Sequence, residues 1–192
     1  MTAPTLTPRS YADLTIPAPG VFTLDPAHTS AGFVARHLMV SKVRGSFTQI
    51  SGEIVIADNP LESTVTVHIP AAGIDTGVTD RDNHLRSPDF LDVERYPELT
   101  FRSLRVSELS GNEFTLVGEL AIRDVVREVS LRVEFEGLAQ SPWGGEVIGF
   151  TASTEIDREQ FGMTWNQALE TGGVLVGKTV KIEISAEAVR KA

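Results

Sequence analysis

Arginine, aspartate and histidine side chains that could carry out chemistry are concentrated in one short segment, "TDRDNHLRSPDFLDVERYP", residues 79–97. It places His84 close in sequence to Asp82 and Asp89. An imidazole beside carboxylates could act as a general acid or base, or as a metal ligand. Arg81 and His84 are three residues apart and would share one face of a helix. Arg81 could clamp the segment to strand-end carbonyls, or both side chains could contact the polar end of a ligand, and the sequence leaves both open.

The remaining histidines and serines add little support for catalysis. The histidines are His28, His37, His68 and His84, and none forms an H-E-x-x-H or His-x-His pair. No G-x-S-x-G nucleophile motif is present. Because the chain has no cysteine, disulfides, thiolate zinc sites and cysteine nucleophiles are excluded. We therefore expect no catalysis, metal or cofactor, and keep a metal-binding or hydrolytic protein using His28, His37 and His84 as an alternative.

Composition argues against nucleic acid as a partner. The formal net charge is −9, the isoelectric point is about 4.9, and no cluster of Lys and Arg stands out. A protein that neutralises phosphates needs a basic surface. The N-terminal residues lack the basic and apolar regions of a secretory signal, and no apolar run reaches the roughly eighteen residues of a transmembrane helix. We expect a soluble, cytoplasmic protein.

Alternating apolar and polar residues dominate the chain from Val21 onward. In "KTVKIEISAEA", for example, Val180, Ile182 and Ile184 alternate with Lys181 and charged or polar neighbours. About eight such strands, separated by short turns, predict an antiparallel meander with one apolar face, which tends to close on itself. The sequence therefore predicts one all-β, lipocalin-like, eight-stranded antiparallel barrel over residues 21–192. A two-sheet sandwich is the alternative fold, and residues 1–20 are expected to form a flexible arm.

Two irregular segments interrupt the strands. Residues 79–93 are expected to form two short helical turns, since Thr79 with Asp82 resembles a capping box and Ser87-Pro88 a second helix start. The second segment, residues 156–178, is too long and too apolar for a hairpin loop. Together they could cover one mouth of the barrel. The apolar side chains expected to face the interior from these segments are Leu85, Phe90, Leu91, Phe161, Met163 and Trp165.

The inward positions do not reveal whether the barrel is filled or hollow. A barrel of eight strands can be filled by side chains or can hold one small ligand. A filled barrel could act as a protein-interaction module, whereas a hollow one would suit a chain-like lipid. The strand residues assigned to the interior are Phe33, Ala35, His37, Phe47, Val65, Val67, Phe101, Phe114, Leu116 and Phe150.

Several segments together resemble the YceI-like family of lipocalin-like polyisoprenoid-binding proteins. The resemblance covers Phe22 to Val189. The most specific part is "GIDTGVTDRDNHLRSPDFLDVERYPELTFRS", residues 73–103. The others are "LDPAHTSAGFVARHLMVSKVRGSF", "VGELAIRDVVREVSL", "GFTASTEIDREQFGMTWN" and "GKTVKIEISAEA".

The resemblance implies an extended barrel whose apolar tunnel holds a polyisoprenoid, an isoprenoid quinone or a fatty-acid amide-like chain, without catalysis. It implies that Phe33, Phe47, Phe101, Phe114, Phe150 and Phe161 line or close the tunnel. It also matches His28, His37, Arg81, His84 and Arg158 to recurrent polar positions of the family. On this basis we expect a carrier or storage protein for a long isoprenoid or acyl lipid, with a homodimer as a possible assembly.

Overall fold

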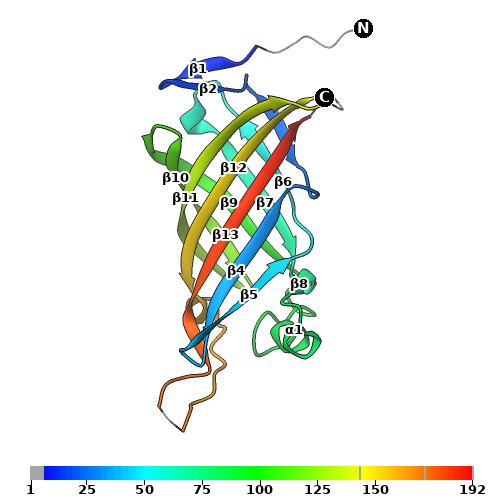
Figure 1. The fold of residues 1–192 in the computed structure, drawn as a ribbon, viewed down its shortest axis with the longest axis vertical. Coiled ribbons are helices and arrows are strands. Elements are labelled where there is room, and N and C mark those ends of the chain that lie inside the picture. The colour runs from blue at the N-terminus through cyan, green and yellow to red at the C-terminus, as the bar shows by residue number, and fades with distance from the viewer. Residues whose placement is uncertain (1–6, 143, 171, 192) are drawn as a thin grey trace.

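The alternating segments form a closed ring of antiparallel strands in the computed structural model (Figure 1). The structure describes residues 7–142, 144–170 and 172–191. The eight strands of the ring follow the order β12-β11-β10-β9-β7-β6-β3-β13, and β13 closes it by pairing with β12. The predicted barrel is confirmed, and the alternative sandwich is not formed. The ring strands are β3 (Gly20–Leu24), β6 (Ser51–Ile56), β7 (Thr64–Pro70), β9 (Glu98–Ser110), β10 (Glu113–Ile122), β11 (Val125–Gln140), β12 (Glu146–Asp157) and β13 (Val176–Arg190).

A side branch completes the lower part of the wall. Strand β13 pairs with β3 at its C-terminal end and with β4 (Ser30–His37) between Val176 and Ser185. Strand β4 pairs with β5 (Ser41–Phe47), which pairs with the short β8 (Ile74–Asp75). At the change of partner, the Thr29 hydroxyl donates to the Glu187 carbonyl at 3.0 Å and accepts from its N–H at 3.2 Å. The Glu187 carbonyl also accepts from the Asp25 N–H at 2.8 Å, so Thr29 and Asp25 together bind the backbone of β13 where it changes partner.

Alternation along each strand separates an apolar inner face from a charged outer face. On β13, Val180, Ile182 and Ile184 point into the barrel. Between them, Lys181 and Glu183 point outward and form an ion pair at 2.6 Å. Exposed pairs of this kind contribute only about 0–1 kcal/mol each, so burial of the inner face carries most of the stability.

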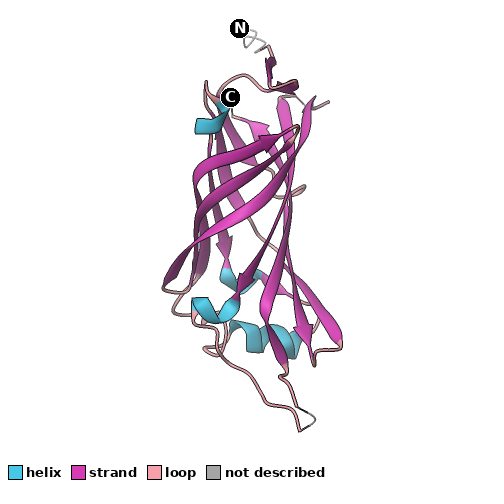
Figure 2. Ribbon diagram, turned by 90° about the vertical axis from the view of Figure 1, so that its left-hand side faces the viewer, coloured by secondary structure: helices cyan, strands magenta, loops and turns pink. Residues whose placement is uncertain are grey.

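The segment after β8 forms one helix, α1 (Thr79–Arg86), at the lower end of the barrel (Figure 2). The expected capping box is wrong, because the N-cap is Val78 and the Asp82 carboxylate instead accepts hydrogen bonds from the N–H and hydroxyl of Thr76. The second helical turn expected at Ser87 is also wrong. Ser87 ends the helix, since its hydroxyl donates to the His84 carbonyl at 2.7 Å and a turn follows.

The opposite end carries a hairpin of β1 (Arg9–Tyr11) and β2 (Leu14–Ile16). This differs from the arm expected for residues 1–20, of which residues 1–6 lie outside the described part. The hairpin turns through Ala12 and Asp13, which both have positive φ angles, 46° and 65°. A positive φ is uncommon for alanine, and the pair lacks the glycine that usually marks a two-residue hairpin turn, so Asp13 is the only local turn signal at these two positions.

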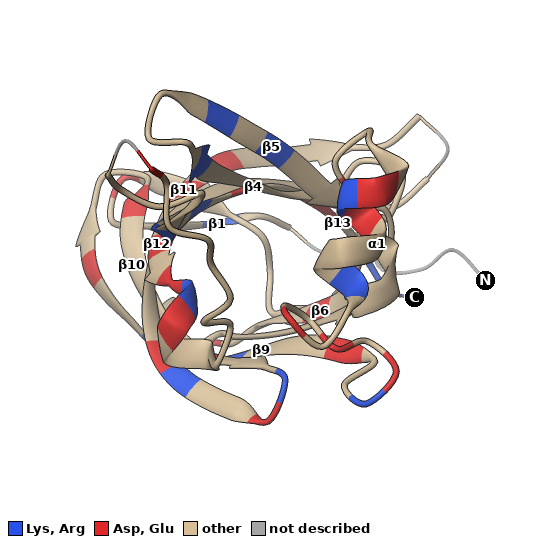
Figure 3. Cartoon of the chain, turned by 90° about the horizontal axis from the view of Figure 1, so that it is seen from below, with Lys and Arg blue, Asp and Glu red and all other residues tan. Residues whose placement is uncertain are grey.

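Three 3₁₀ helices complete the described secondary structure: η1 (Pro60–Glu62), η2 (Ala71–Gly73) and η3 (Arg158–Phe161). Figure 3, seen from below, shows the ring of strands with α1 beside its lower rim. Among the described helices, none has the length and apolar character needed to cross a bilayer.

Candidate functional site

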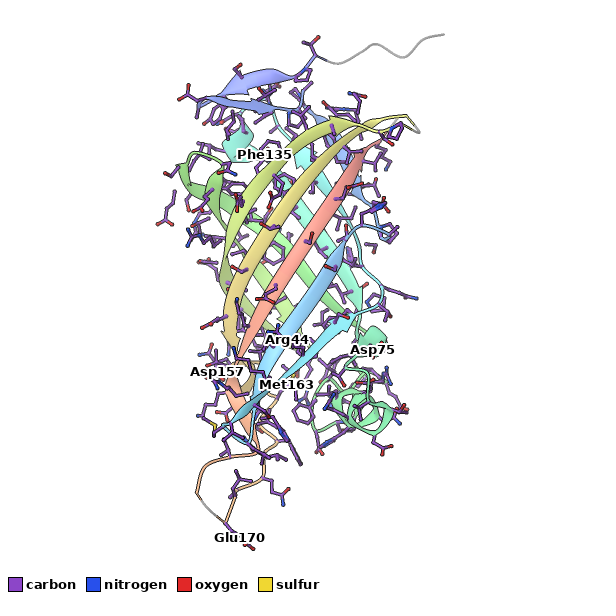
Figure 4. All side chains as sticks on the ribbon, viewed as in Figure 1. Arg44, Asp75, Phe135, Asp157, Met163 and Glu170 are labelled. Atoms are coloured by element: carbon purple, nitrogen blue, oxygen red, sulfur yellow. The ribbon has the colours of Figure 1, made fainter. Side chains whose placement is uncertain are left out.

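The barrel encloses a cavity of about 360 Å³ along its axis. Phe135 lines it near the upper end and Met163 near the lower end (Figure 4). The wall is almost wholly apolar and receives side chains from strands all around the ring. Alternation explains this composition, since every second residue of each strand must face the interior. The cavity contradicts the filled barrel, which was the basis of the interaction-module alternative.

Most of the residues predicted for the interior lie on the cavity wall. They come from strands on opposite sides of the barrel. In each of these strands, the side of the strand that was predicted to face inward carries residues of the cavity wall. The two irregular segments contribute four of their six predicted apolar side chains. The predicted residues found on the wall are Phe33, Ala35, Phe47, Val65, Val67, Leu85, Phe90, Leu91, Phe101, Phe114, Leu116, Phe150 and Met163.

Two predicted residues are placed off the wall by local packing. His37 ends β4 at the hairpin with β5, where its carbonyl accepts from Val40 N–H and Ser41 hydroxyl, so the strand stops below the cavity. Phe161 is fully buried, but it packs in the lower core against Ile122 and Ile156 instead of facing the open space.

Arg81 is also off the wall, and its contacts favour the clamp over the head-group contact. Its Nε donates to the Thr76 hydroxyl at 2.7 Å and its Nη2 to the Thr76 carbonyl at 3.0 Å. A second tie between α1 and the barrel comes from Arg86, for which the sequence predicted no role. Arg86 donates to the carbonyls of Ala72 at 2.9 Å and Ile74 at 2.6 Å.

His84, a candidate for ligand contact, and Trp165, which was predicted to face the interior, do not line the cavity and instead join the two irregular segments below it. Their rings meet edge to face with centroids 4.5 Å apart, and each also contacts Phe90, at 5.1 Å and 5.5 Å. His84 Nε2 is 2.8 Å from a carboxylate oxygen of Asp89. Aromatic pairs of this kind add about 0.5–1.5 kcal/mol beyond area burial. The two segments therefore cover the lower mouth together.

One charged side chain lines the cavity within the described part of the chain. Arg158 is only 3% exposed and lies where β12 ends. Its guanidinium donates to the carbonyls of Gly177 at 3.0 Å, Val176 at 3.4 Å and Met163. Burial lowers the pKa of Arg158 from its usual value, against the opposing field of Asp157 and Glu159. These hydrogen bonds hold the start of β13 to the second irregular segment, residues 156–178.

The upper end of the cavity has lining residues that the sequence analysis did not assign. Tyr11, Leu14 and Pro17 of the N-terminal hairpin reach the wall, together with Pro60 and Leu61 of η1. Arg9 ties the hairpin down by donating to the carbonyls of Ala57, Asp58 and Pro17. Strands of three residues are too short to show a reliable period, so periodicity could not have found them.

The histidines of the metal alternative have separate partners. His28 lies beside Asp25 at 2.8 Å and Glu187 at 3.6 Å, and these three form the one group with metal-like spacing among the described residues. His84 pairs with Asp89, and His37 ends β4. Because His28 is exposed at the bend where β13 changes partner, the group is best understood as surface ion pairs that secure the bend.

We expect His28 to titrate above its usual pKa of 6.5, because the hydrogen bond to Asp25 and the field of Glu187 favour the imidazolium. The same contact lowers the pKa of Asp25 below 3.8. The contribution of His28 to stability is therefore present below pH 6.5 and lost as the pH rises through its folded pKa. NMR titration should show the raised pKa in the native protein and a fall in Asp25→Asn. An equal pKa in both would contradict the pairing.

The comparisons with known proteins agree with this geometry. The model of the YceI-like domain family matches residues 22–188. A UPF0312 protein of Staphylococcus aureus strain USA300 is 44% identical over 170 residues, covering 86% of this chain and 95% of that protein.

Solved structures share the barrel. A YCEI protein of Campylobacter jejuni superposes with a TM-score of 0.70 at 28% identity, covering 82% of this chain and 90% of that one. A structure described as a polyisoprenoid binding domain from Saccharophagus degradans has a TM-score of 0.67 at 13% identity, covering 88% and 98%. At that identity the second likeness concerns the fold alone. The family match extends over nearly the whole barrel, and the chain belongs to the YceI-like family.

Proposed function

We propose that this protein binds one long apolar chain, of polyisoprenoid or acyl type, along the axis of its barrel. The observation that carries the proposal is the continuous apolar cavity of about 360 Å³. Burial of each methylene contributes about 0.8 kcal/mol, so ten carbons supply roughly 8 kcal/mol before association costs. A relative of the same fold is described as polyisoprenoid-binding, which supports this class of ligand.

The role that fits such a site is a carrier or store for the lipid, with an isoprenoid quinone as one candidate guest. A carrier has to shield the chain from water and release it again. The cytoplasmic location and the homodimer expected from the sequence stay predictions, and so does the absence of catalysis.

A displacement experiment tests the proposal. The neutral fluorophore N-phenyl-1-naphthylamine should brighten in the cavity, and geranylgeraniol and hexadecanol should displace it with one-to-one stoichiometry. Short alcohols such as butanol should compete far more weakly, because each lost methylene weakens binding about fourfold. If no long chain displaces the fluorophore, or if chain length has no effect, the proposal is wrong.

The N-terminal hairpin should control how fast the ligand leaves. We expect Arg9→Gln to speed release of bound fluorophore several-fold, because Arg9 donates to carbonyls of residues 57 and 58 beside η1. Stopped-flow dilution measures the release rate. Arg102→Gln is the matched control, since it removes an exposed pair with Glu119 on the outer wall. Equal release from the native protein and Arg9→Gln would place the exit elsewhere.

A further inference from the structure

The apolar tunnel ends at a buried cation. Arg158 is the one charged residue on the wall within the described ranges. It directly follows Asp157, the last residue of β12, which Figure 4 shows at the lower end of the barrel. The upper part of the wall, around Phe135, Leu14 and Pro60, is apolar. A chain that fills the tunnel would therefore meet different chemistry at its two ends.

No carboxylate among the described residues pairs directly with this guanidinium. Among the described residues, none of the ion pairs involves Arg158. Its sequence neighbours are engaged elsewhere, since Asp157 accepts from the Glu159 N–H at 2.9 Å and Glu159 pairs with Lys178 at 2.9 Å. The half-buried Arg190 differs, because it meets Glu146 at 2.6 Å. A buried charge without a counter-ion is costly, and a ligand can offset that cost.

The guanidinium also has hydrogen-bonding capacity left over. Arginine has five N–H donors, and the three carbonyls of Met163, Val176 and Gly177 take one from each nitrogen. One N–H on each terminal nitrogen then remains without an acceptor among the described residues. Two such donors can serve the two oxygens of a carboxylate or phosphate. The Phe90 ring, 5.8 Å from the guanidinium, helps to exclude water from the same place.

We propose that Arg158 is the head-group site of the tunnel, and that it selects long-chain lipids ending in a carboxylate or phosphate. This inference rests on the proposed function, because the chain must occupy the tunnel for its acidic end to reach Arg158. Lipids with a neutral end still bind through the chain alone. Those with a cationic end bind more weakly than either, since they bring a like charge to a buried cation.

A series of ligands with one chain and different ends tests the proposal on the native protein. Lauric acid, dodecanol and dodecylamine are compared at pH 7.5 by displacement of N-phenyl-1-naphthylamine, with dodecyl phosphate added to separate a carboxylate from a phosphate preference. We expect the acids to bind about tenfold to hundredfold more tightly than the alcohol, which corresponds to hydrogen bonds to a charged group. Equal binding of acid and alcohol would overturn the head-group site. If none of the four ligands displaces the fluorophore, the proposal that the barrel binds lipid is itself wrong.

Variants then assign the preference to one side chain. Arg158→Gln should abolish the advantage of lauric acid while dodecanol binds as before, and Arg158→Lys should retain part of it. Arg81→Gln should keep it, because Arg81 bonds only to Thr76 among the described residues. A preference that survives in Arg158→Gln or disappears in Arg81→Gln would overturn the assignment.

A further measurement needs no variant, in case Arg158→Gln fails to fold. The carboxyl carbon of ¹³C-labelled lauric acid reports its own ionisation by NMR when bound to the native protein. Contact with Arg158 should lower the pKa of the bound acid below that of the free acid. A raised pKa would mean that the carboxyl lies in an apolar part of the tunnel, and would contradict the proposal.

Discussion

Ala35→Phe is expected to weaken binding of a long alcohol about hundredfold while leaving the barrel folded. Ala35 lies on the cavity wall, and its cross-strand partners Val43 and Val180 flank it on both sides. A phenyl ring here would fill space that the ligand needs, so a chain would lose several methylene contacts worth about 0.8 kcal/mol each. Because the space is open in the free protein, we expect the free energy of unfolding to change by less than about 1 kcal/mol.

Gly118→Ala provides the matched control for Ala35→Phe. Both residues are small and sit in the barrel wall, but an added Cβ at Gly118 would lie 2.4 Å from the ring of Phe101 and 2.7 Å from the Arg102 carbonyl. Overpacking of this kind costs about 1–3 kcal/mol. Chemical denaturation and displacement titration of both variants should therefore separate a binding defect from a folding defect. If Ala35→Phe binds like the native protein, the cavity is not the binding site.

Arg190→Met is expected to lower the free energy of unfolding by about 3–5 kcal/mol, the cost of leaving one buried charge unpaired. Arg190 and Glu146 form an ion pair whose side chains are only 13% and 4% exposed. Arg190 also donates to the carbonyls of Ala18 and Pro19, and its guanidinium lies 4.5 Å from the Phe22 ring centroid. The pair thus fixes the start of β3 to the last strand of the ring.

The double variant Glu146→Leu/Arg190→Met tests the reason for that loss. The Glu146 side chain is buried, and its Oε1 has no hydrogen-bond partner among the described residues. Removing both charges should recover much of the stability, because replacing a buried pair by apolar groups is often nearly neutral. Urea denaturation of the two single variants and the double variant completes the cycle. Additive losses would show that the two side chains act independently.

The barrel could be predicted because strict alternation of apolar and polar residues leaves only one way for each strand to face the core. In β13, a shift of one residue would turn Val180, Ile182 and Ile184 to water and Lys181 into the core, so the inward face is fixed by the sequence. The alternating pattern also predicted that Phe33, Phe101 and Phe150 face inward, and all three lie on the cavity wall. It could not decide between a filled and a hollow interior, because that depends on side-chain packing across the ring.

The failures have a common physical cause, since they lie where tertiary contacts override local signals. Asp82 carries the spacing of a capping box, but its carboxylate turns to Thr76. The N-terminal hairpin is held by Arg9 and carbonyls far along the chain, beyond the reach of local propensity. Arg158 could be recognised only because it matches a recurrent polar position of the YceI-like family. Its burial and unpaired charge arise from the packing of β12, η3 and β13, which local sequence does not reveal.

Native mass spectrometry of the protein purified from its own host tests the central claim most directly. Gentle ionisation keeps a tightly held ligand, and denaturation of the same sample releases it for lipid analysis. We expect one extra mass per chain that resolves into a single prenyl or acyl lipid. A bare polypeptide mass, together with no uptake of added geranylgeraniol, would contradict lipid binding in the barrel.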